Sequence, residues 1–203
     1  MVLIEESYNV GKYRCRIIYN SVPGLPIVFL HGYSFTSDVW RDIGVLDKLE
    51  EEKIPFIAID MPYGARSICS PHTRSVDENL FVLKEIYRGV FGSLKPLIVG
   101  ASLGGYIALR YALEKPVAGL FLIAPAHALE KELVKKYRSL SVPTIIIWGS
   151  RDRIVKREEM EKLSQLLEAK LLIYDKAGHP AYLDYPDKFI NDLLSFHKAL
   201  KLE

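Results

Sequence analysis

Apolar and polar residues follow two distinct patterns along this chain. Short, almost wholly apolar runs predict buried strands at 26–30, 54–59, 97–99, 117–123, 144–148 and 171–174. Longer segments with apolar residues at three- and four-residue steps predict helices at about 37–51, from the capping box at 75–78, after 102, at 129–139, at about 156–168 and at about 183–200. Unbroken apolar strands separated by helices indicate a mainly parallel sheet that is covered on both faces.

The first twenty residues show a different periodicity. Segments 2–9 and 12–20 predict two strands that turn at Gly11. In the second strand apolar and charged residues alternate, which places Cys15 on the inner face as a small core hydrophobe. We expect this hairpin to lie antiparallel at one edge of an eight-stranded sheet. Because the sequence contains no repeat, low-complexity segment or linker, we expect residues 1–203 to form one domain.

Composition narrows the class of protein. The chain has 203 residues, of which 49% are hydrophobic and 26% charged, as in soluble globular proteins. A net charge of +2 with no basic tract argues against nucleic-acid or anionic-membrane partners. No apolar run approaches the roughly 20 residues of a membrane helix. Residues 1–6 turn acidic too early for a signal peptide, so we expect a cytoplasmic protein. Two cysteines outside any C-x-x-C pair do not predict a disulfide framework.

One stretch carries the strongest chemical signal. Residues 97–99 predict a strand, Gly100-Ala101-Ser102-Leu103-Gly104 forms a G-x-S-x-G pattern, and an apolar helix follows. A serine on a strained strand-to-helix turn needs neighbours without a Cβ, which Gly100 and Gly104 provide. The pattern predicts a nucleophile elbow, and the alternative is a passive serine in an ordinary turn.

Polar residues at the other strand ends provide a separate test. In an open α/β sheet, ligands bind outside the carboxyl ends of the strands. Those ends carry His31-Gly32-Tyr33, Asp60, Ser102, His127, Gly149-Ser150-Arg151-Asp152 and Gly178-His179. A serine, an acid and a histidine therefore meet at one edge, in the chain order typical of α/β-hydrolases.

Together these motifs resemble the α/β-hydrolase superfamily, and in particular its small serine esterase-like members. The resemblance spans essentially the whole chain and rests on His31-Gly32, the D-x-P-x-G-x-x-S pattern at 60–67, the elbow, the G-x-x-D pattern at 149–152, and Gly178-His179. It implies the α/β-hydrolase fold. It also implies roles for specific residues: Ser102 as nucleophile, His179 as base, Asp152 as orienting acid, and Tyr33 as one oxyanion-hole donor beside Leu103.

Elementary chemistry agrees with these roles. A serine hydroxyl becomes a good nucleophile only when a base takes its proton, and an imidazole can accept and return a proton near neutral pH. An acid behind the imidazole fixes its tautomer, and aimed N–H groups stabilise the oxyanion. Asp152 could instead be a surface partner of Arg151 or Arg153, and Asp175 and Asp184 are possible substitutes.

The segment that follows residue 124 bears on access to the site. Many members of the superfamily insert a helical cap here, but only 18 residues separate Ala124 from Pro143. We therefore expect no cap domain and an open site. Its edge is predicted to include aromatic and histidine side chains, namely His31, Trp40, Tyr63, His127 and Tyr182. His31 could equally shape the oxyanion loop, and His127 could be a solvated loop residue.

The resulting hypothesis is a serine hydrolase that cleaves a carboxylic ester or thioester through an acyl-enzyme on Ser102. No cofactor is expected, and no metal site, since the histidines and cysteines show no ligand spacing. The substrate could be a small ester or an acyl group on a larger molecule. Two alternatives remain: a non-catalytic protein-interaction module that retains the triad, and a cofactor-free perhydrolase. The sequence predicts no oligomeric state.

Overall fold

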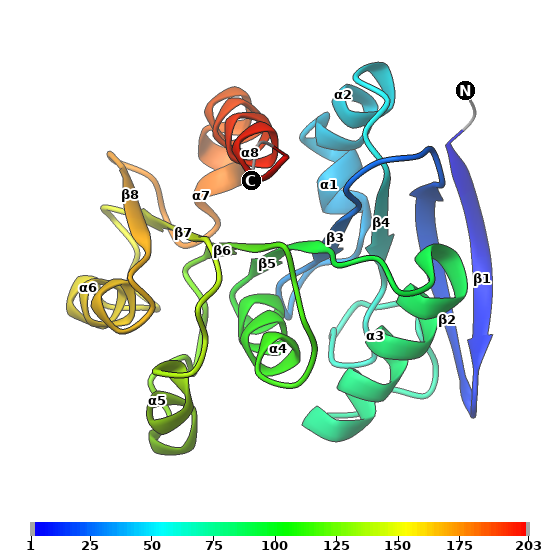
Figure 1. Ribbon diagram of the computed structural model, residues 1–203, viewed down its shortest axis with the longest axis horizontal. Helices are drawn as coiled ribbons and strands as arrows, with labels where there is room; N and C mark the ends of the chain where they lie inside the picture. The colour runs from blue at the N-terminus through cyan, green and yellow to red at the C-terminus, as the bar shows by residue number, and fades with distance from the viewer. Residues whose placement is uncertain (1–2, 202–203) are drawn as a thin grey trace.

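A computed structural model describes residues 3–201, within which eight strands form one sheet (Figure 1). The strands are β1 (Ile4–Val10), β2 (Tyr13–Asn20), β3 (Ile27–Leu30), β4 (Phe56–Ile59), β5 (Leu97–Ala101), β6 (Gly119–Ile123), β7 (Thr144–Gly149) and β8 (Lys170–Tyr174). Their order across the sheet is β1-β2-β4-β3-β5-β6-β7-β8. β1 pairs with β2 and β2 with β4 in antiparallel register, and every later pair is parallel. The predicted mainly parallel sheet with an antiparallel hairpin at one edge is confirmed.

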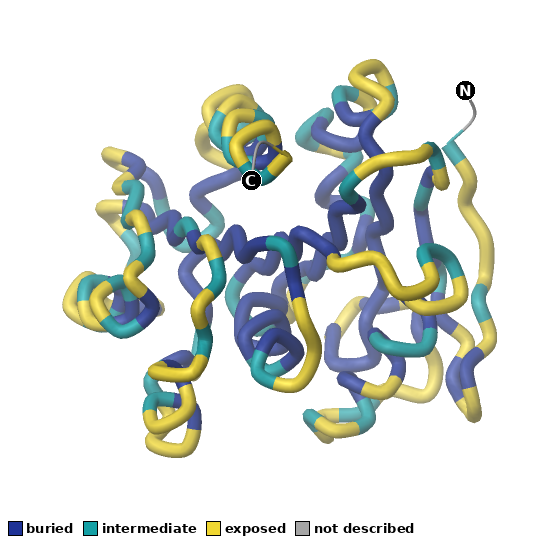
Figure 2. Tube along the Cα trace, viewed as in Figure 1, coloured by how far each residue is buried: buried dark blue, intermediate teal, exposed yellow. Residues whose placement is uncertain are grey.

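Helices cover both faces of this sheet. They are α1 (Asp38–Asp42), α2 (Val45–Glu51), α3 (Val76–Phe91), α4 (Leu103–Ala112), α5 (Lys131–Tyr137), α6 (Arg157–Leu166), α7 (Ala181–Asp184) and α8 (Pro186–Leu200). α3, α4, α5 and α6 lie below the sheet in Figure 1, and α1, α2, α7 and α8 lie above it. Each layer has its own apolar cluster against one face, so β3 to β7 are buried from both sides (Figure 2).

Two predicted helices are interrupted. The helix expected at 37–51 is divided into α1 and α2 at Gly44, whose φ of 78° lies in the left-handed region that glycine tolerates. The helix expected at 183–200 begins properly only at Pro186, which occupies the first position of α8. The short helix α7 precedes it and belongs to the loop that leaves β8. The apolar periodicity marked these regions correctly but did not reveal the breaks.

Cys15 is fully buried on the inner face of β2, as predicted, but the sequence did not reveal that it is paired. Cys15, on β2, forms a disulfide with Cys69, which lies 54 residues later in the segment between β4 and α3. Both side chains are fully buried, and beside them Arg14 and Ser70 exchange two backbone hydrogen bonds of 2.8 and 3.0 Å. The disulfide thus attaches the loop between β4 and α3 to the edge of the sheet. Two cysteines far apart in sequence give no local signal of this pairing.

The connection between β6 and β7 is short, as predicted. The chain there forms only α5, whose Leu133 and Tyr137 side chains are buried in the core. No cap domain is inserted at this point, and the carboxyl ends of the strands stay open on that side. Among the described residues, no helix has the length and apolar character required to cross a membrane.

Candidate active site

Ser102 lies at the sharp turn between β5 and α4. Its φ of 51° and ψ of −113° are unusual for a residue with a side chain, and such strained positions concentrate at functional sites. The turn is fixed from both sides, since the Ser102 N–H donates to the Ile123 carbonyl at 2.8 Å and the Ala126 N–H donates to the Ser102 carbonyl at 3.1 Å. The strained serine is therefore held between the ends of β5 and β6.

The two glycines of the motif are required by packing. A Cβ on Gly100 would lie 2.6 Å from the Gly104 carbonyl oxygen, and a Cβ on Gly104 would overlap the Leu30 carbonyl oxygen. Both obstacles are backbone atoms, which cannot move away as a flexible side chain could. The spacing in the sequence thus reflects close contact of α4 with β5 and β3.

His179 and Asp152 meet behind this edge. The His179 Nδ1–H donates to Asp152 Oδ2 at 2.8 Å, and Asp152 Oδ1 accepts the backbone N–H groups of Ile154 and Val155 at 2.7 and 3.0 Å. Burial by itself would raise the pKa of Asp152, but these three hydrogen bonds outweigh it and hold the pKa below its ordinary value. The Asp152 side chain is fully buried, whereas His179 keeps 15% of its side chain exposed. Asp152 is therefore an ionised, fixed acceptor for the imidazole.

The loop after β8 carries His179 back across the sheet edge. It is held to the Asp152 loop by a 2.8 Å hydrogen bond from the Arg151 N–H to the Ala177 carbonyl. Three residues beyond His179, the Tyr182 ring stacks on Trp40 of α1, with centroids 5.0 Å apart. Because α1 follows β3, and β5, β6 and β7 separate β3 from β8 in the sheet, this contact draws the loop from the end of β8 toward the end of β3. His179 is thereby brought to the side of the sheet where Ser102 lies.

The hydroxyl of Ser102 has no partner in this arrangement. Among residues 3–201, no hydrogen bond joins it to His179 or to any other side chain. Catalytic hydrogen bonds are often long or poorly aligned until substrate binds. The structure therefore brings His179 and Asp152 into contact, and the predicted bond from Ser102 stays a prediction.

Two backbone N–H groups beside Ser102 have no protein acceptor in the described part of the chain. They belong to Leu103, the first residue of α4, and to Tyr33, in the loop after β3. A Cβ on Gly32 would lie 3.8 Å from the Cβ of Ser102, so the Tyr33 loop passes directly next to the serine. The Tyr33 carbonyl accepts the Ala65 N–H at 2.8 Å, which fixes the loop. The oxyanion-hole role of these two groups stays a prediction.

His31 does not lie at the edge of the site but is buried between two loops, which it connects. It is fully buried; its Nδ1–H donates to the Gly32 carbonyl at 2.8 Å, and its Nε2 accepts the Met61 N–H at 3.0 Å. The prediction that His31 contacts substrate is therefore wrong, because both ring nitrogens are occupied and no surface is exposed. It connects the loops after β3 and β4, which agrees with the alternative that it shapes the Tyr33 loop.

The buried His31 predicts a pH dependence of stability. Burial lowers its pKa below the ordinary 6.5. Below that pH the unfolded chain binds a proton that the folded chain excludes, so the free energy of unfolding falls as pH decreases. We expect His31→Gln to reduce this fall by up to about 1.4 kcal/mol per pH unit, a limit approached well below pH 6.5, where the unfolded histidine is fully protonated. Urea unfolding at pH 7, 6 and 5 measures the free energy of unfolding of wild type, His31→Gln and the control His72→Gln, in which an exposed histidine is replaced. The same dependence on pH in all three proteins would contradict the prediction.

Two more residues predicted to edge the site lie in the core instead. Trp40 is fully buried and Tyr182 is 1% exposed. Their rings stack on each other and pack against Phe189 of α8 at centroid distances of 6.0 and 5.8 Å. Their position near catalytic motifs in the sequence was misleading, because α1 and the loop after β8 bury these aromatic faces against α8.

Tyr63 and His127 do border a cavity at the predicted site. This cavity has a volume of about 280 Å³, and its wall includes both Tyr33 and Leu103. The remaining lining residues come from the segment before α3, from α3, from α4 and from the loop after β6: Arg74, Val76, Asn79, Tyr106, Ile107 and Glu130. These six residues carry no signal in the sequence, because each is an unremarkable residue in its own segment. Only the packing of α3 beside α4 brings them together.

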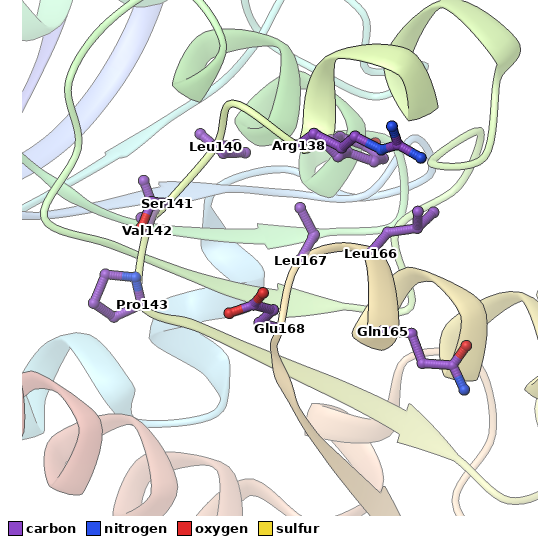
Figure 3. A pocket seen from close by; sticks show the side chains of 10 residues that line it. Arg138, Leu140, Ser141, Val142, Pro143, Gln165, Leu166, Leu167 and Glu168 are labelled. Atoms are coloured by element: carbon purple, nitrogen blue, oxygen red, sulfur yellow. The ribbon is translucent and has the colours of Figure 1, made fainter.

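A larger hollow lies elsewhere. It has a volume of about 660 Å³ and lies between the segment after α5 and the end of α6, with Arg138, Pro143, Gln165 and Glu168 among its lining residues (Figure 3). These residues precede β7 and β8, so the hollow is at the amino ends of the strands, opposite Ser102 and His179. It contains neither a serine elbow nor a histidine. Within residues 3–201, no group of three or more histidine, cysteine or carboxylate side chains is arranged to bind a metal ion.

Comparison with known proteins gives a consistent result. A family profile described as "Alpha/beta hydrolase family" matches residues 27–135, and one described as "alpha/beta hydrolase fold" matches residues 130–186. The chain is 31% identical over 179 residues to "Putative protein-lysine deacylase ABHD14B" of Rattus norvegicus, covering 86% of this chain and 83% of the relative. Among solved structures it resembles a "predicted CIB-like hydrolase" of Thermoplasma acidophilum, with 24% identity, a TM-score of 0.84 and coverage of 97% and 98%. It also resembles the carboxylesterase CesB of Bacillus subtilis, with 18% identity, a TM-score of 0.79 and coverage of 97% and 92%. This chain belongs to the alpha/beta hydrolase family.

Proposed function

We propose that this protein is a serine hydrolase that cleaves a carboxylic ester or thioester through an acyl-enzyme on Ser102. The observation that carries the proposal is the His179–Asp152 hydrogen bond of 2.8 Å at the edge of the sheet where the strained Ser102 turn lies. The carboxylate accepts from Nδ1, which leaves Nε2 as the free base of the neutral imidazole. Such a base can take a proton from a serine hydroxyl and return it to a leaving group.

The proposed reaction follows from these positions. Ser102 Oγ attacks the acyl carbonyl carbon while its proton moves to His179 Nε2. The negative charge that develops on the carbonyl oxygen is stabilised by the Tyr33 and Leu103 N–H groups, each worth roughly 3 kcal/mol of barrier in comparable sites. The imidazolium then protonates the departing alcohol or thiol. Water attacks the acyl-enzyme by the same route and releases the acid.

A second candidate within the same chemistry is removal of an acyl group from a lysine side chain. It is supported by the name of the Rattus norvegicus relative, "Putative protein-lysine deacylase ABHD14B", and by the absence of an inserted domain between β6 and β7. An acyl group on a protein side chain needs an approach that a cap would block. The two candidates differ in the leaving group, which is an alcohol or thiol in one and an amine in the other.

The test is a covalent probe followed by a substrate panel. A fluorophosphonate is expected to form one adduct, on the peptide that contains Ser102, as located by mass spectrometry. No adduct, or an adduct on another residue, would contradict the proposal. p-Nitrophenyl esters and thioesters of graded acyl length are then compared with acetyl- and longer acyl-lysine peptides. A higher kcat/KM for the esters and thioesters favours the first candidate, and a higher value for the peptides favours the second.

A further inference from the structure

A second hollow adjoins the cavity next to the oxyanion-hole residues. It has a volume of about 380 Å³ and lies beside Pro62, Gly64, Ala65 and His72. Three residues, Tyr33, Tyr63 and Arg74, line both this outer hollow and the 280 Å³ inner cavity. The two hollows therefore share part of their wall, and we refer to them together as the groove.

Arg74 has no carboxylate partner among the described residues, whereas several other arginines form ion pairs. Asp77, the acid nearest in sequence, forms no ion pair with Arg74 in the described chain, and Glu78 is occupied by Lys12 at 2.6 Å and by the Thr73 hydroxyl. Glu130, across the inner cavity, accepts the Tyr106 hydroxyl at 2.9 Å. Arg74 is exposed and lines both hollows, and no ion pair is formed by it within residues 3–201.

The backbone on both sides of Arg74 is fixed. The Thr73 N–H donates to the Pro62 carbonyl at 3.1 Å, and the Asn79 side chain donates to the carbonyls of Thr73 and Ser75 at 3.2 and 2.8 Å. Ser75 caps α3 by accepting the Glu78 N–H at 3.3 Å. The base of the Arg74 side chain is therefore positioned by the same segment that forms the wall of the groove.

The distribution of charge indicates where an anion would bind. The inner cavity contains Glu130, which repels an anion, whereas the outer hollow is lined by no acidic residue in the described chain. A guanidinium binds carboxylate and phosphate groups through paired N–H donors. An anion in the outer hollow would meet Arg74 without facing a carboxylate.

We propose that the substrate carries an anionic group, a carboxylate or a phosphate, that Arg74 binds in the outer hollow while the acyl carbonyl lies at Ser102. This inference rests on the proposed hydrolase function and specifies its substrate class. The anion is part either of the acyl group or of the leaving group, and the shared recognition chemistry is the ion pair with Arg74.

The test compares charged and neutral esters in wild type and Arg74→Gln. The first pair consists of p-nitrophenyl hemisuccinate, which has an anionic acyl group, and neutral p-nitrophenyl butyrate. The second pair consists of 4-acetoxybenzoate, which has an anionic leaving group, and neutral phenyl acetate. For each pair we compare the kcat/KM of the anionic ester with that of the neutral ester. In one of the two pairs, this ratio is expected to be at least tenfold lower in Arg74→Gln than in wild type, mainly because KM for the anionic ester rises. Arg74→Lys should recover part of the ratio, since a point charge keeps attraction but loses the paired geometry.

Arg66→Gln is the matched control, because Arg66 lies in the same loop but lines neither hollow. Unchanged ratios in Arg74→Gln, or an equal fall in Arg66→Gln, would contradict the inference. Ligand-observed NMR of phenyl phosphate and of succinate measures binding to the anion site directly, because neither compound is a carboxylic ester. Equal binding of these anions to wild type and Arg74→Gln would contradict the inference. Labelling of Ser102 by the fluorophosphonate tests the proposed hydrolase function separately, so the two can fail independently.

Discussion

Replacing Ser102 with alanine is expected to lower kcat for p-nitrophenyl acetate by on the order of 10⁴-fold or more, since loss of a nucleophile removes the acyl-enzyme route altogether. Alanine keeps the Cβ, so the strained turn and its hydrogen bonds to Ile123 and Ala126 are preserved. Steady-state hydrolysis and fluorophosphonate labelling measure the effect, and thermal unfolding verifies that the variant is folded.

Ser34→Ala provides the control for Ser102→Ala. Ser34 is an exposed serine in the loop next to Tyr33, and its removal should leave turnover within about twofold, as expected for a surface substitution. If Ser102→Ala loses less than about tenfold of kcat while remaining folded, Ser102 is not the nucleophile. The proposed mechanism would then have to be abandoned.

Asp152→Asn is expected to have the second-largest effect, a loss of kcat on the order of 10⁴-fold, as for an orienting acid in other serine hydrolases. The reason is the fixed orientation of the side chain. Asp152 Oδ1 accepts two backbone N–H groups, from Ile154 and Val155, so the asparagine oxygen must remain there. The amide NH₂ then faces His179 Nδ1 and selects the tautomer whose Nε2 carries a proton. That nitrogen cannot accept the proton of Ser102.

The other acids near His179 serve as controls for this assignment. Asp175 accepts the Ser150 hydroxyl at 3.1 Å, and Asp184 accepts the Gly178 N–H at 2.7 Å, so neither contacts the imidazole. Steady-state kinetics of the three Asp→Asn variants should show a far smaller loss at 175 and 184. A greater loss in Asp184→Asn than in Asp152→Asn would show that the wrong acid has been chosen.

Local patterns in the sequence predicted the succession of elements because each pattern involves neighbours only a few residues apart. The glycine spacing of the Ser102 turn is also visible locally, although the atoms that leave no space for a Cβ belong to α4 at Gly100 and to the distant end of β3 at Gly104. The uninterrupted apolar runs likewise predict strands buried on both faces. The breaks at Gly44 and Pro186 were missed because the apolar stripe continues across them.

Contacts between distant segments could not be predicted in this way. Trp40 and Tyr182 lie close to catalytic motifs in the sequence, yet they stack on each other in the core. Cys15 and Cys69 form a disulfide because the loop after β4 runs along β2. The sheet order places β4 between β2 and β3, and no local periodicity encodes which strands become neighbours.

By itself, the sequence determined the α/β architecture, the hairpin at its edge, the short connection after β6 and the position of the strained serine turn, since these follow from hydrophobic periodicity and steric limits on the backbone. Only the tertiary structure decided that His179 contacts Asp152, that His31 is buried between two loops, and that Arg74 lines the two hollows beside Tyr33. The physical reason is that these properties depend on which distant surfaces cover a side chain, and that is set by the packing of the loops over the ends of the sheet.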